Sequence, residues 1–202
     1  MAENLKPFVA SSALVDPSVF LGHGTKVWHF TQIASEANIG TDVTIGTNVY
    51  IGPKVQIGDS SKVQNNSLIY EPCKIGRGVF VGPGVIFTND HNPRAVNPDF
   101  GKKDKGDWNQ TGVVVEDGAS IGAGAICISP ITIGAWSLVA SGSIVTKSVK
   151  PHSLVAGNPA RQIGWVGKHG NKLIQKEGYL QCPVSMQEFV LVDDQLIERG
   201  SE

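Results

Sequence analysis

The sequence has little charge, few aromatic residues and few cysteines. Charged residues make up 17% of the 202 residues and the net charge is −1, so we expect neither nucleic acid nor a membrane surface as a partner. Aromatic residues reach 7% whereas there are 24 glycines, a balance that suits a narrow solenoid better than a layered globule. The three cysteines, Cys73, Cys127 and Cys182, are odd in number and widely spaced. They therefore indicate free thiols in a reducing compartment.

Targeting and membrane signals are also missing from the sequence. The first residues include neither a basic n-region nor a long apolar h-region, so we do not expect a signal peptide. The most apolar window, 121–145, is interrupted by Gly, Ser and Pro and keeps the period described below, so it is not a membrane span. Together with the cysteines, these features predict a cytoplasmic protein.

A strict six-residue period runs through the first half of the chain. Every sixth residue is large and apolar: Val9, Val15, Leu21, Val27, Ile33, Ile39, Ile45, Ile51, Ile57, Val63, Ile69, Ile75, Val81 and Phe87. We call these the register residues. The position two before each is mostly small or β-branched, and the third position after is often Gly or Asn, which accept the positive φ of a tight corner. Short strands joined by corners, repeated every six residues, predict an all-β parallel β-helix.

The repeat stops after Phe87 and resumes at Val115, Ile121, Cys127, Ile133, Val139 and Val145. The segment 88–112 between the two blocks is rich in Gly, Pro, Asn, Asp and Lys, which predicts a long functional loop. In total the two blocks predict about seven coils. We expect residues 1–165 to form the solenoid domain with its loop, and residues 166–202 a tail with a small hairpin over 186–197.

The pairs Ile39-Gly40, Ile45-Gly46, Ile51-Gly52, Ile57-Gly58 and Ile75-Gly76 resemble the hexapeptide acyltransferases. The resemblance implies a left-handed parallel β-helix with three faces and about 18 residues per coil. It also implies acetyl-CoA as co-substrate and no metal. Members of this family bind their substrates in clefts between three parallel subunits, so we expect a homotrimer.

Longer segments are more specific than the hexads: 27–30, 63–71 and 85–90, followed by 93–95. They resemble the branch of nucleotide-linked amino-sugar N-acetyltransferases, across residues 9 to 165 and more weakly beyond. The resemblance implies transfer of an acetyl group to the 3-amino group of a UDP- or dTDP-linked sugar in surface-polysaccharide synthesis. Such a sugar would be a UDP-2-acetamido-3-amino-glucuronate or a dTDP-3-amino-dideoxyhexose.

The start of the loop carries the candidate catalytic residues, Asn89, Asp90 and His91. An attacking amine must lose a proton while negative charge builds on the thioester oxygen. The Asn89 amide oxygen would accept from a neutral amine, and Asp90 or His91 would serve as a base. We rank Asn89 first because it lies at the loop hinge beside Phe87. The alternative for Asn89 and Asp90 is simple turn chemistry before Pro93.

Candidate acceptor contacts are large residues among small ones. Most positions directly after a register residue are Gly or Ala, but Trp28, Gln64 and Tyr70 are not, and Trp28 and Gln64 share one side two coils apart. An aromatic and an amide flanking Gly46 would hold a ring, or else fill a gap against a neighbouring subunit. The predicted acceptor-binding residues are Trp28, His29, Gln64, Asn65, Tyr70, Glu71 and Arg94. We expect Asn48 and Asn66 to stack at a corner, and His152 and His169 to be solvated.

The second block supplies the candidate donor site. Small residues there leave backbone groups open to a pantetheine arm, and Lys147 and Arg161 are placed to meet CoA phosphates. The predicted donor-binding residues are Gly122, Ala123, Ala140, Ser141, Gly142, Lys147 and Arg161.

Three other functions compete with this one. The first is a hexapeptide acyltransferase with another acceptor. The second is a zinc enzyme resembling hexapeptide carbonic anhydrases, which would have to recruit His23, His29 and His91. The third is a non-catalytic scaffold, which needs neither the long loop nor the large outward side chains.

Overall fold

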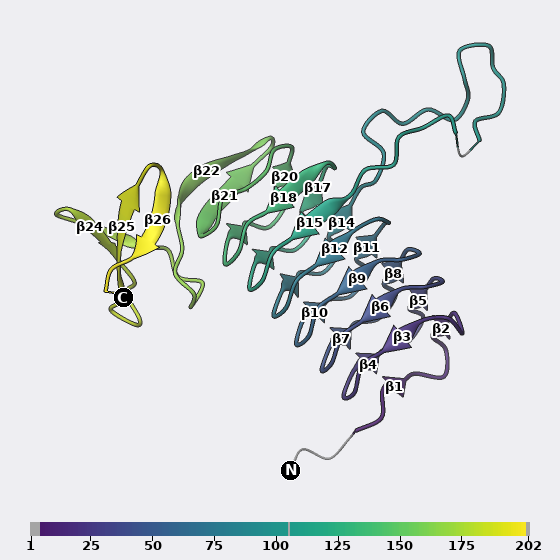
Figure 1. Ribbon diagram of the computed structural model, residues 1–202, viewed down its shortest axis with the longest axis horizontal. Helices are drawn as coiled ribbons and strands as arrows, with labels where there is room; N and C mark the ends of the chain where they lie inside the picture. The colour runs from purple at the N-terminus through teal and green to yellow at the C-terminus, as the bar shows by residue number, and fades with distance from the viewer. Residues whose placement is uncertain (1–4, 105, 201–202) are drawn as a thin grey trace.

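The computed structural model describes residues 5–104 and 106–200. Within this part of the chain all regular elements are β-strands, so no helix there is long and apolar enough to cross a bilayer. A straight solenoid forms most of the molecule, a long loop projects from its side, and a small sheet lies beyond its C-terminal end (Figure 1). Residues 1–4 of the predicted polar lead-in lie outside the described residues.

Three parallel sheets form the sides of the solenoid. Sheet A contains β1 (Phe8–Val9), β4 (Lys26–Val27), β7 (Thr44–Ile45), β10 (Lys62–Val63), β13 (Phe80–Val81), β16 (Ser120–Ile121), β19 (Leu138–Val139) and β21 (Ser153–Gly157), to which β22 (Ala160–Trp165) adds antiparallel. Sheet B contains β2 (Leu14–Val15), β5 (Gln32–Ile33), β8 (Tyr50–Ile51), β11 (Leu68–Ile69), β14 (Ile86–Phe87), β17 (Ile126–Cys127) and β20 (Ile144–Val145). Sheet C contains β3 (Phe20–Leu21), β6 (Asn38–Ile39), β9 (Gln56–Ile57), β12 (Lys74–Ile75), β15 (Val113–Val115) and β18 (Ile131–Ile133).

The coils stack with an 18-residue register before the loop. Val27 pairs with Ile45, which pairs with Val63. Sheet B contributes seven strands, and β21 begins an eighth coil on sheet A. The predicted left-handed parallel β-helix of about seven coils is confirmed. We name its edges corner AB, corner BC and corner CA after the sheets that meet there.

The register residues form the core. From Val27 onwards they are almost completely buried, and Cys73 and Cys127 are buried free thiols among them, as predicted. Burial raises the pKa of the Cys127 thiol to about 12, so it stays protonated and inert. The first coil is the exception, because no coil covers its outer end and Val9 keeps 40% of its surface exposed.

Successive coils are tied together at their corners by acidic and amide side chains. The backbone N–H of Thr41 donates to Asp59 Oδ1 at 2.7 Å, that of Thr47 to Asn65 Oδ1 at 2.8 Å, and that of Arg77 to Asp117 Oδ1 at 2.8 Å. Each acceptor lies over the glycine of the coil below. A Cβ on Gly46 would come within 2.7 Å of the Asn65 nitrogen, so this glycine is required by the close approach of the next coil.

Glu71 occupies the equivalent position at corner BC, but the coil below it offers no backbone N–H to donate. A Cβ on Gly52 would meet the Glu71 carboxylate, and the next residue, Pro53, has no N–H to donate. Glu71 Oε2 is buried without a hydrogen-bond partner, whereas Oε1 accepts from the Gln110 side chain at 3.1 Å. A buried carboxylate oxygen left in this state destabilises the fold.

Replacing Pro53 with alanine should therefore stabilise the protein. The restored N–H would meet a charged acceptor, worth about 1.5–3 kcal/mol, against a loss of about 0.4–1 kcal/mol from the freer unfolded chain. We expect a net gain of about 1 kcal/mol, or about 2–4 °C in Tm, measured by thermal and urea unfolding.

Pro83→Ala is the matched control. Ala123 takes the place of Glu71 over this proline, since a Cβ on Gly82 would lie 2.7 Å from the Ala123 nitrogen. Without an acceptor above it, Pro83→Ala should destabilise by about 0.4–1 kcal/mol. If Pro53→Ala and Pro83→Ala changed the free energy of unfolding in the same direction, Glu71 would not be an acceptor that lacks its donor.

The C-terminal tail is larger than the hairpin that the sequence predicts. That hairpin is confirmed as β25 (Glu188–Val192) and β26 (Gln195–Glu198), with Asp193 and Asp194 at positive φ in its two-residue turn. The sheet also contains β23 (Ile174–Lys176) and β24 (Tyr179–Gln181), which the sequence analysis missed. Its hydrophobic cluster is separate from the solenoid core and consists of Trp165, Leu173, Leu180, Cys182 and Phe189.

His152 joins the solenoid to this tail, so the expectation that it is solvated was wrong. Its ring lies 5.9 Å from the Phe189 ring, and its Nδ1 donates to the carbonyl of Val166 at 3.0 Å. Burial lowers its pKa. Lys150 also forms an ion pair with Asp194 of the tail. The tail therefore lies over the C-terminal end of the solenoid.

Candidate active site

The predicted loop leaves the solenoid at corner BC, between β14 and β15, and projects well beyond it (Figure 1). Ser129, a buried residue of the next coil, holds both ends of the loop. Its N–H donates to Thr88 Oγ1 at 3.1 Å, its hydroxyl bonds with Thr111 Oγ1 at 2.9 Å, and its carbonyl bonds with the His91 ring at 3.0 Å. The ends also bond directly, from the Thr111 N–H to the Asn89 carbonyl at 3.1 Å. The loop base is therefore a fixed part of the solenoid.

The bond to Ser129 determines which nitrogen of His91 carries the proton. A carbonyl oxygen can only accept, so Nδ1 of His91 must be the donor. In the neutral ring Nε2 is then unprotonated and able to accept a proton. The sequence ranking placed Asn89 ahead of His91 because only Asn89 was expected to be anchored. The structure anchors both, which removes that reason.

A hollow of about 430 Å³ lies within the loop, between its two arms, and brings several predicted residues together. Its lining includes Asn89, Asp90 and Arg94, together with Lys103 and Trp108, which the sequence analysis missed. An adjoining hollow of about 410 Å³ is lined by Asp90, His91 and again Trp108. Trp108 is a tryptophan in a mostly polar loop, and this contrast is the sequence signal that could have identified it as a site residue.

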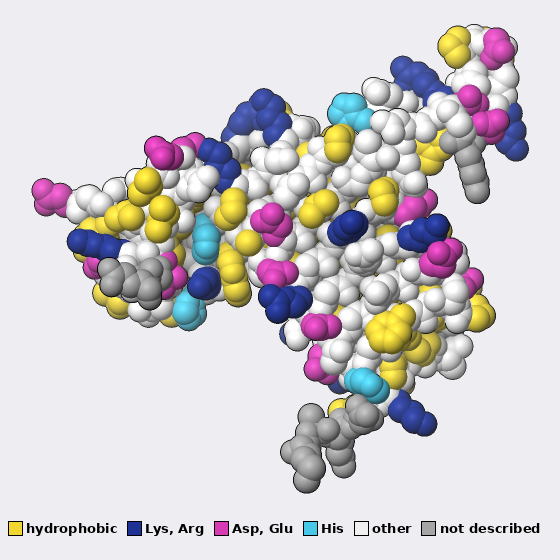
Figure 2. All heavy atoms as spheres, viewed as in Figure 1, with side chains coloured by type: hydrophobic (Ala, Val, Ile, Leu, Met, Phe, Trp, Pro, Cys, Tyr) yellow, Lys and Arg dark blue, Asp and Glu magenta, His cyan; other side chains and the backbone are white. Residues whose placement is uncertain are grey.

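The projecting loop carries charges of both signs (Figure 2). Arg94 and Lys103 supply cations, and Asp90 and Asp104 supply carboxylates. Asp90 Oδ1 accepts from the Asn92 N–H at 2.9 Å, so the turn role considered for Asp90 is present. Asp107 is held by the Asp104 N–H and then by the Asn97 side chain, which lower its pKa. The hollows thus combine cations that can bind anionic groups with carboxylates that can accept a proton.

Tyr70 and Glu71 lie on corner BC in the coil directly below the loop. Tyr70 N–H donates to the Phe87 carbonyl at 3.4 Å, and the Tyr70 ring lies 5.3 Å from the ring of Tyr50. Glu71 binds the loop through Gln110. Glu71 therefore fixes, through Gln110, the end of the loop at which Thr111 contacts Asn89.

The remaining acceptor residues, Trp28, His29, Gln64 and Asn65, lie on corner AB, a different edge of the solenoid. Trp28 and Gln64 are two coils apart with Gly46 between them, as predicted, and the Trp28 ring packs edge-on against Phe8 at 5.6 Å. The stacking of Asn48 on Asn66 is confirmed by a 2.9 Å hydrogen bond.

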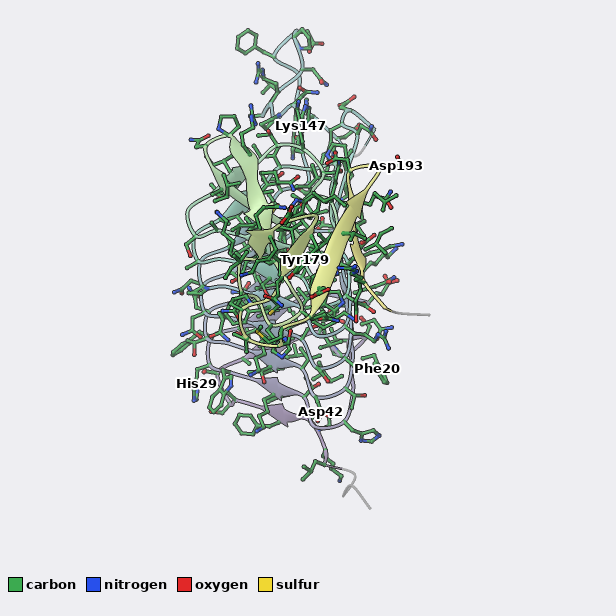
Figure 3. The ribbon with its side chains drawn as sticks, turned by 90° about the vertical axis from the view of Figure 1, so that its left-hand side faces the viewer. Phe20, His29, Asp42, Lys147, Tyr179 and Asp193 are labelled. Carbon is green, nitrogen blue, oxygen red and sulfur yellow. The ribbon has the colours of Figure 1, made fainter. Side chains whose placement is uncertain are left out.

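Two of these side chains have local partners. His29 Nδ1 bonds with Ser12 Oγ at 2.8 Å, at the lower left of Figure 3. Asn65 uses its oxygen in the corner contact with Thr47, which leaves its amide nitrogen without a hydrogen bond among the described residues.

The donor residues also form two groups. Corner AB carries Gly122, Ala123, Ala140, Ser141 and Gly142 in adjacent coils, where the Gly142 N–H donates to the Ala123 carbonyl at 2.8 Å.

Lys147 and Arg161 instead line a hollow of about 240 Å³ between β20, β21 and β22. Two cations around one hollow suit phosphate groups.

The histidines of the zinc alternative do not converge within the chain. His23 lies at corner CA, His29 at corner AB and His91 at corner BC. Among residues 5–104 and 106–200, no group of three or more His, Cys, Asp or Glu side chains is arranged to hold a metal ion.

Two family models match the repeat. One describes a bacterial transferase hexapeptide of six repeats and matches residues 54–89. The other describes the hexapeptide repeat of succinyl-transferase and matches residues 112–147. The matches lie on either side of the loop.

Curated relatives match parts of the chain. The bifunctional protein GlmU of Thermotoga maritima is 36% identical over 97 residues, 46% of this chain and 18% of that protein. The dTDP-3-amino-3,6-dideoxy-alpha-D-galactopyranose 3-N-acetyltransferase of Aneurinibacillus thermoaerophilus is 38% identical over 71 residues, 34% of this chain and 37% of that protein. The chain thus spans well under half the length of these relatives.

Solved structures share the fold. The N-acyltransferase AntD of Bacillus cereus, in complex with dTDP and coenzyme A, superposes with a TM-score of 0.54 at 18% identity, covering 80% of this chain and 82% of that chain. The repeat models and the parallel solenoid agree on a left-handed β-helix built from hexapeptide repeats, similar to the repeats that these models describe in bacterial transferases.

Proposed function

We propose that this chain is an acetyl-CoA-dependent N-acetyltransferase that acts on the 3-amino group of a UDP- or dTDP-linked amino sugar in surface-polysaccharide synthesis. The observation that carries the proposal is the pair of hollows at the loop base, where Asn89, Asp90, His91 and Arg94 meet. The partial match to a dTDP-amino-sugar 3-N-acetyltransferase supports the acceptor class. The matched repeat models support a transferase.

The chemistry requires little more than positioning and one proton acceptor. The amine nitrogen forms a bond to the thioester carbon, the C–S bond breaks, and CoA leaves as a thiol with the proton that the amine gives up. A proton acceptor beside the amine and fixed positions for both substrates are the main requirements on the protein. Arg94 and Lys103 would bind anionic groups of the acceptor.

The direct test is to incubate the protein with acetyl-CoA and a panel of UDP- and dTDP-linked 3-amino sugars. We expect one acceptor to gain a single acetyl group by mass spectrometry, with release of an equal amount of thiol. Absence of both signals across the panel would end the proposal.

Kinetics of three variants should separate the two catalytic assignments. If His91 is the base, His91→Asn should lower kcat by ~10²–10⁴-fold. If Asn89 accepts from a neutral amine, Asn89→Ala should lower kcat much more than His91→Asn, and the pH profile should survive the His91 change. Asp90→Asn tests whether the carboxylate contributes.

Asn38→Ala, on the outer side of sheet C, is the matched control and should keep full activity. Near-normal kcat in both Asn89→Ala and His91→Asn would remove both residues from the mechanism.

The division of predicted residues between two corners supports the proposed homotrimer. One chain presents the loop on corner BC but the small donor residues and Trp28 on corner AB, so a site containing both needs two chains. Sheet B between them offers an apolar outer column suited to a subunit contact. It consists of Leu68, Ile86, Ile126 and Ile144.

Mixed oligomers would test this assembly. Asn89→Ala subunits and Ser141→Trp subunits should each be inactive as pure trimers. Mixed after unfolding and refolding, they should recover about a quarter of the sites by random assortment, because a loop and a donor corner then come from different chains. Sedimentation checks that each variant is trimeric. No recovery, or an active monomer, would contradict intersubunit sites.

A further inference from the structure

Another hollow, of about 470 Å³, lies on the outer side of sheet B below the loop, near the N-terminal end. It is lined on the outer strand positions by Leu14, Gln32 and Tyr50, and at corner BC by Asp16 and Ala34. The apolar column of sheet B is interrupted here, because Gln32 stands where the coils above carry apolar side chains. None of these residues has a part in the acetyl-transfer chemistry described above.

The upper wall of this hollow is aromatic. The Tyr50 ring contacts the Tyr70 ring at 5.3 Å with an angle of 49° between the planes, so Tyr70 limits the positions that Tyr50 can take. Burial, and then the nearby Glu71 and Tyr70, raise the pKa of Tyr50. Its phenol therefore remains a hydrogen-bond donor at neutral pH.

The polar groups of the hollow combine donors with acceptors. Within the described residues, neither the Gln32 amide nor the Tyr50 hydroxyl has a hydrogen-bond partner. Asp16 Oδ1 accepts from the Ser18 hydroxyl at 2.6 Å and the Ser18 N–H at 2.9 Å, which lowers the pKa of Asp16 and keeps it ionised. Two donors and a nearby acceptor thus surround one flat apolar wall.

This arrangement fits the edge of a pyrimidine-2,4-dione, the ring of uracil and thymine. That ring presents an N–H donor between two carbonyl acceptors and stacks on aromatic side chains. The Gln32 amide N–H can donate to one carbonyl and the oxygen of Gln32 or Asp16 can accept from the ring N–H, while the Tyr50 ring stacks on the face of the base. The carboxylate of Asp16 would repel a phosphate, so the diphosphate must lie away from it.

The distance to the loop is also suitable. Tyr50 lies in the third coil and Asn89 leaves the fifth, a separation of two coils, or roughly 10 Å at about 4.8 Å per coil. A ribose and a diphosphate would span this gap. They would bring the sugar to Asn89 and the phosphates towards Arg94 and Lys103.

We propose that the hollow formed by Gln32, Tyr50 and Asp16 binds the uracil or thymine ring of the nucleotide-linked acceptor. The inference rests on the proposed function, since it takes the acceptor to be a nucleotide sugar. It adds residues for base recognition that neither the repeat nor the loop identifies. It also orients the acceptor, with its base towards the N-terminal coils and its amine at the loop.

Calorimetric titration of the full chain with UDP, dTDP, CDP and GDP tests the proposal without any acetyl transfer. UDP or dTDP should bind at least about tenfold more tightly than CDP and GDP, because all four share the diphosphate and differ in the base edge. Tyr50→Leu should weaken UDP binding by about 5–150-fold through lost stacking, and Gln32→Leu by about tenfold.

Gln56→Leu is the matched control, because Gln56 occupies the same outward strand position on sheet C, and it should leave UDP binding unchanged.

Equal binding of all four nucleotides, no binding of UDP or dTDP, or unchanged UDP binding in both Gln32→Leu and Tyr50→Leu would overturn the base site. Selective UDP binding by a protein that transfers no acetyl group would keep the base site and reject the acetyltransferase. Acetyl transfer with an unchanged acceptor KM in both Gln32→Leu and Tyr50→Leu would keep the acetyltransferase and reject the base site.

Discussion

The spacing between coils is the constraint on which the rest of the structure depends. Backbone hydrogen bonds between parallel strands hold successive coils about 4.8 Å apart, so residues one coil apart are in direct contact. The column Val27, Ile45, Val63 must then be apolar, because each side chain packs on the next. The same spacing leaves no room for a Cβ at Gly46 under Asn65. An insertion can leave only at a corner, and the long loop leaves at corner BC.

The parts of the fold that obey this spacing could be predicted from sequence. The six-residue period and the 18-residue coil predict the register residues, the buried cysteines, the corner pair Asn48 and Asn66, and the position of the loop. The acidic and amide contacts between coils also follow the 18-residue repeat, since Thr41 donates to Asp59 and Thr47 to Asn65. They were missed because such an acceptor stands at only some corners, so the period alone does not reveal it, and Asn65 and Glu71 were assigned to the substrate instead.

The parts that depend on non-repeating contacts could not be predicted in the same way. Ser129 holds the loop through its N–H, carbonyl and hydroxyl, yet in the sequence it is a small residue two positions after a register cysteine. The anchoring of His91 depends on that residue. His152 was expected in solvent because its partners, Val166 and Phe189, belong to the tail, where only one hairpin of the sheet had a sequence signal.

Straight columns also explain why one chain holds only parts of a site. A solenoid with three flat sides and small corner residues forms no deep cleft, and the hollows in this chain are shallow and spread along it. The residues proposed to act together lie on different corners, with the loop on one and the small predicted donor residues on another. Placing corner AB of a second chain against sheet B would bring the loop, the base-binding hollow and the donor corner to one cleft. The regular spacing that makes the solenoid stable thus makes assembly a condition of the proposed activity.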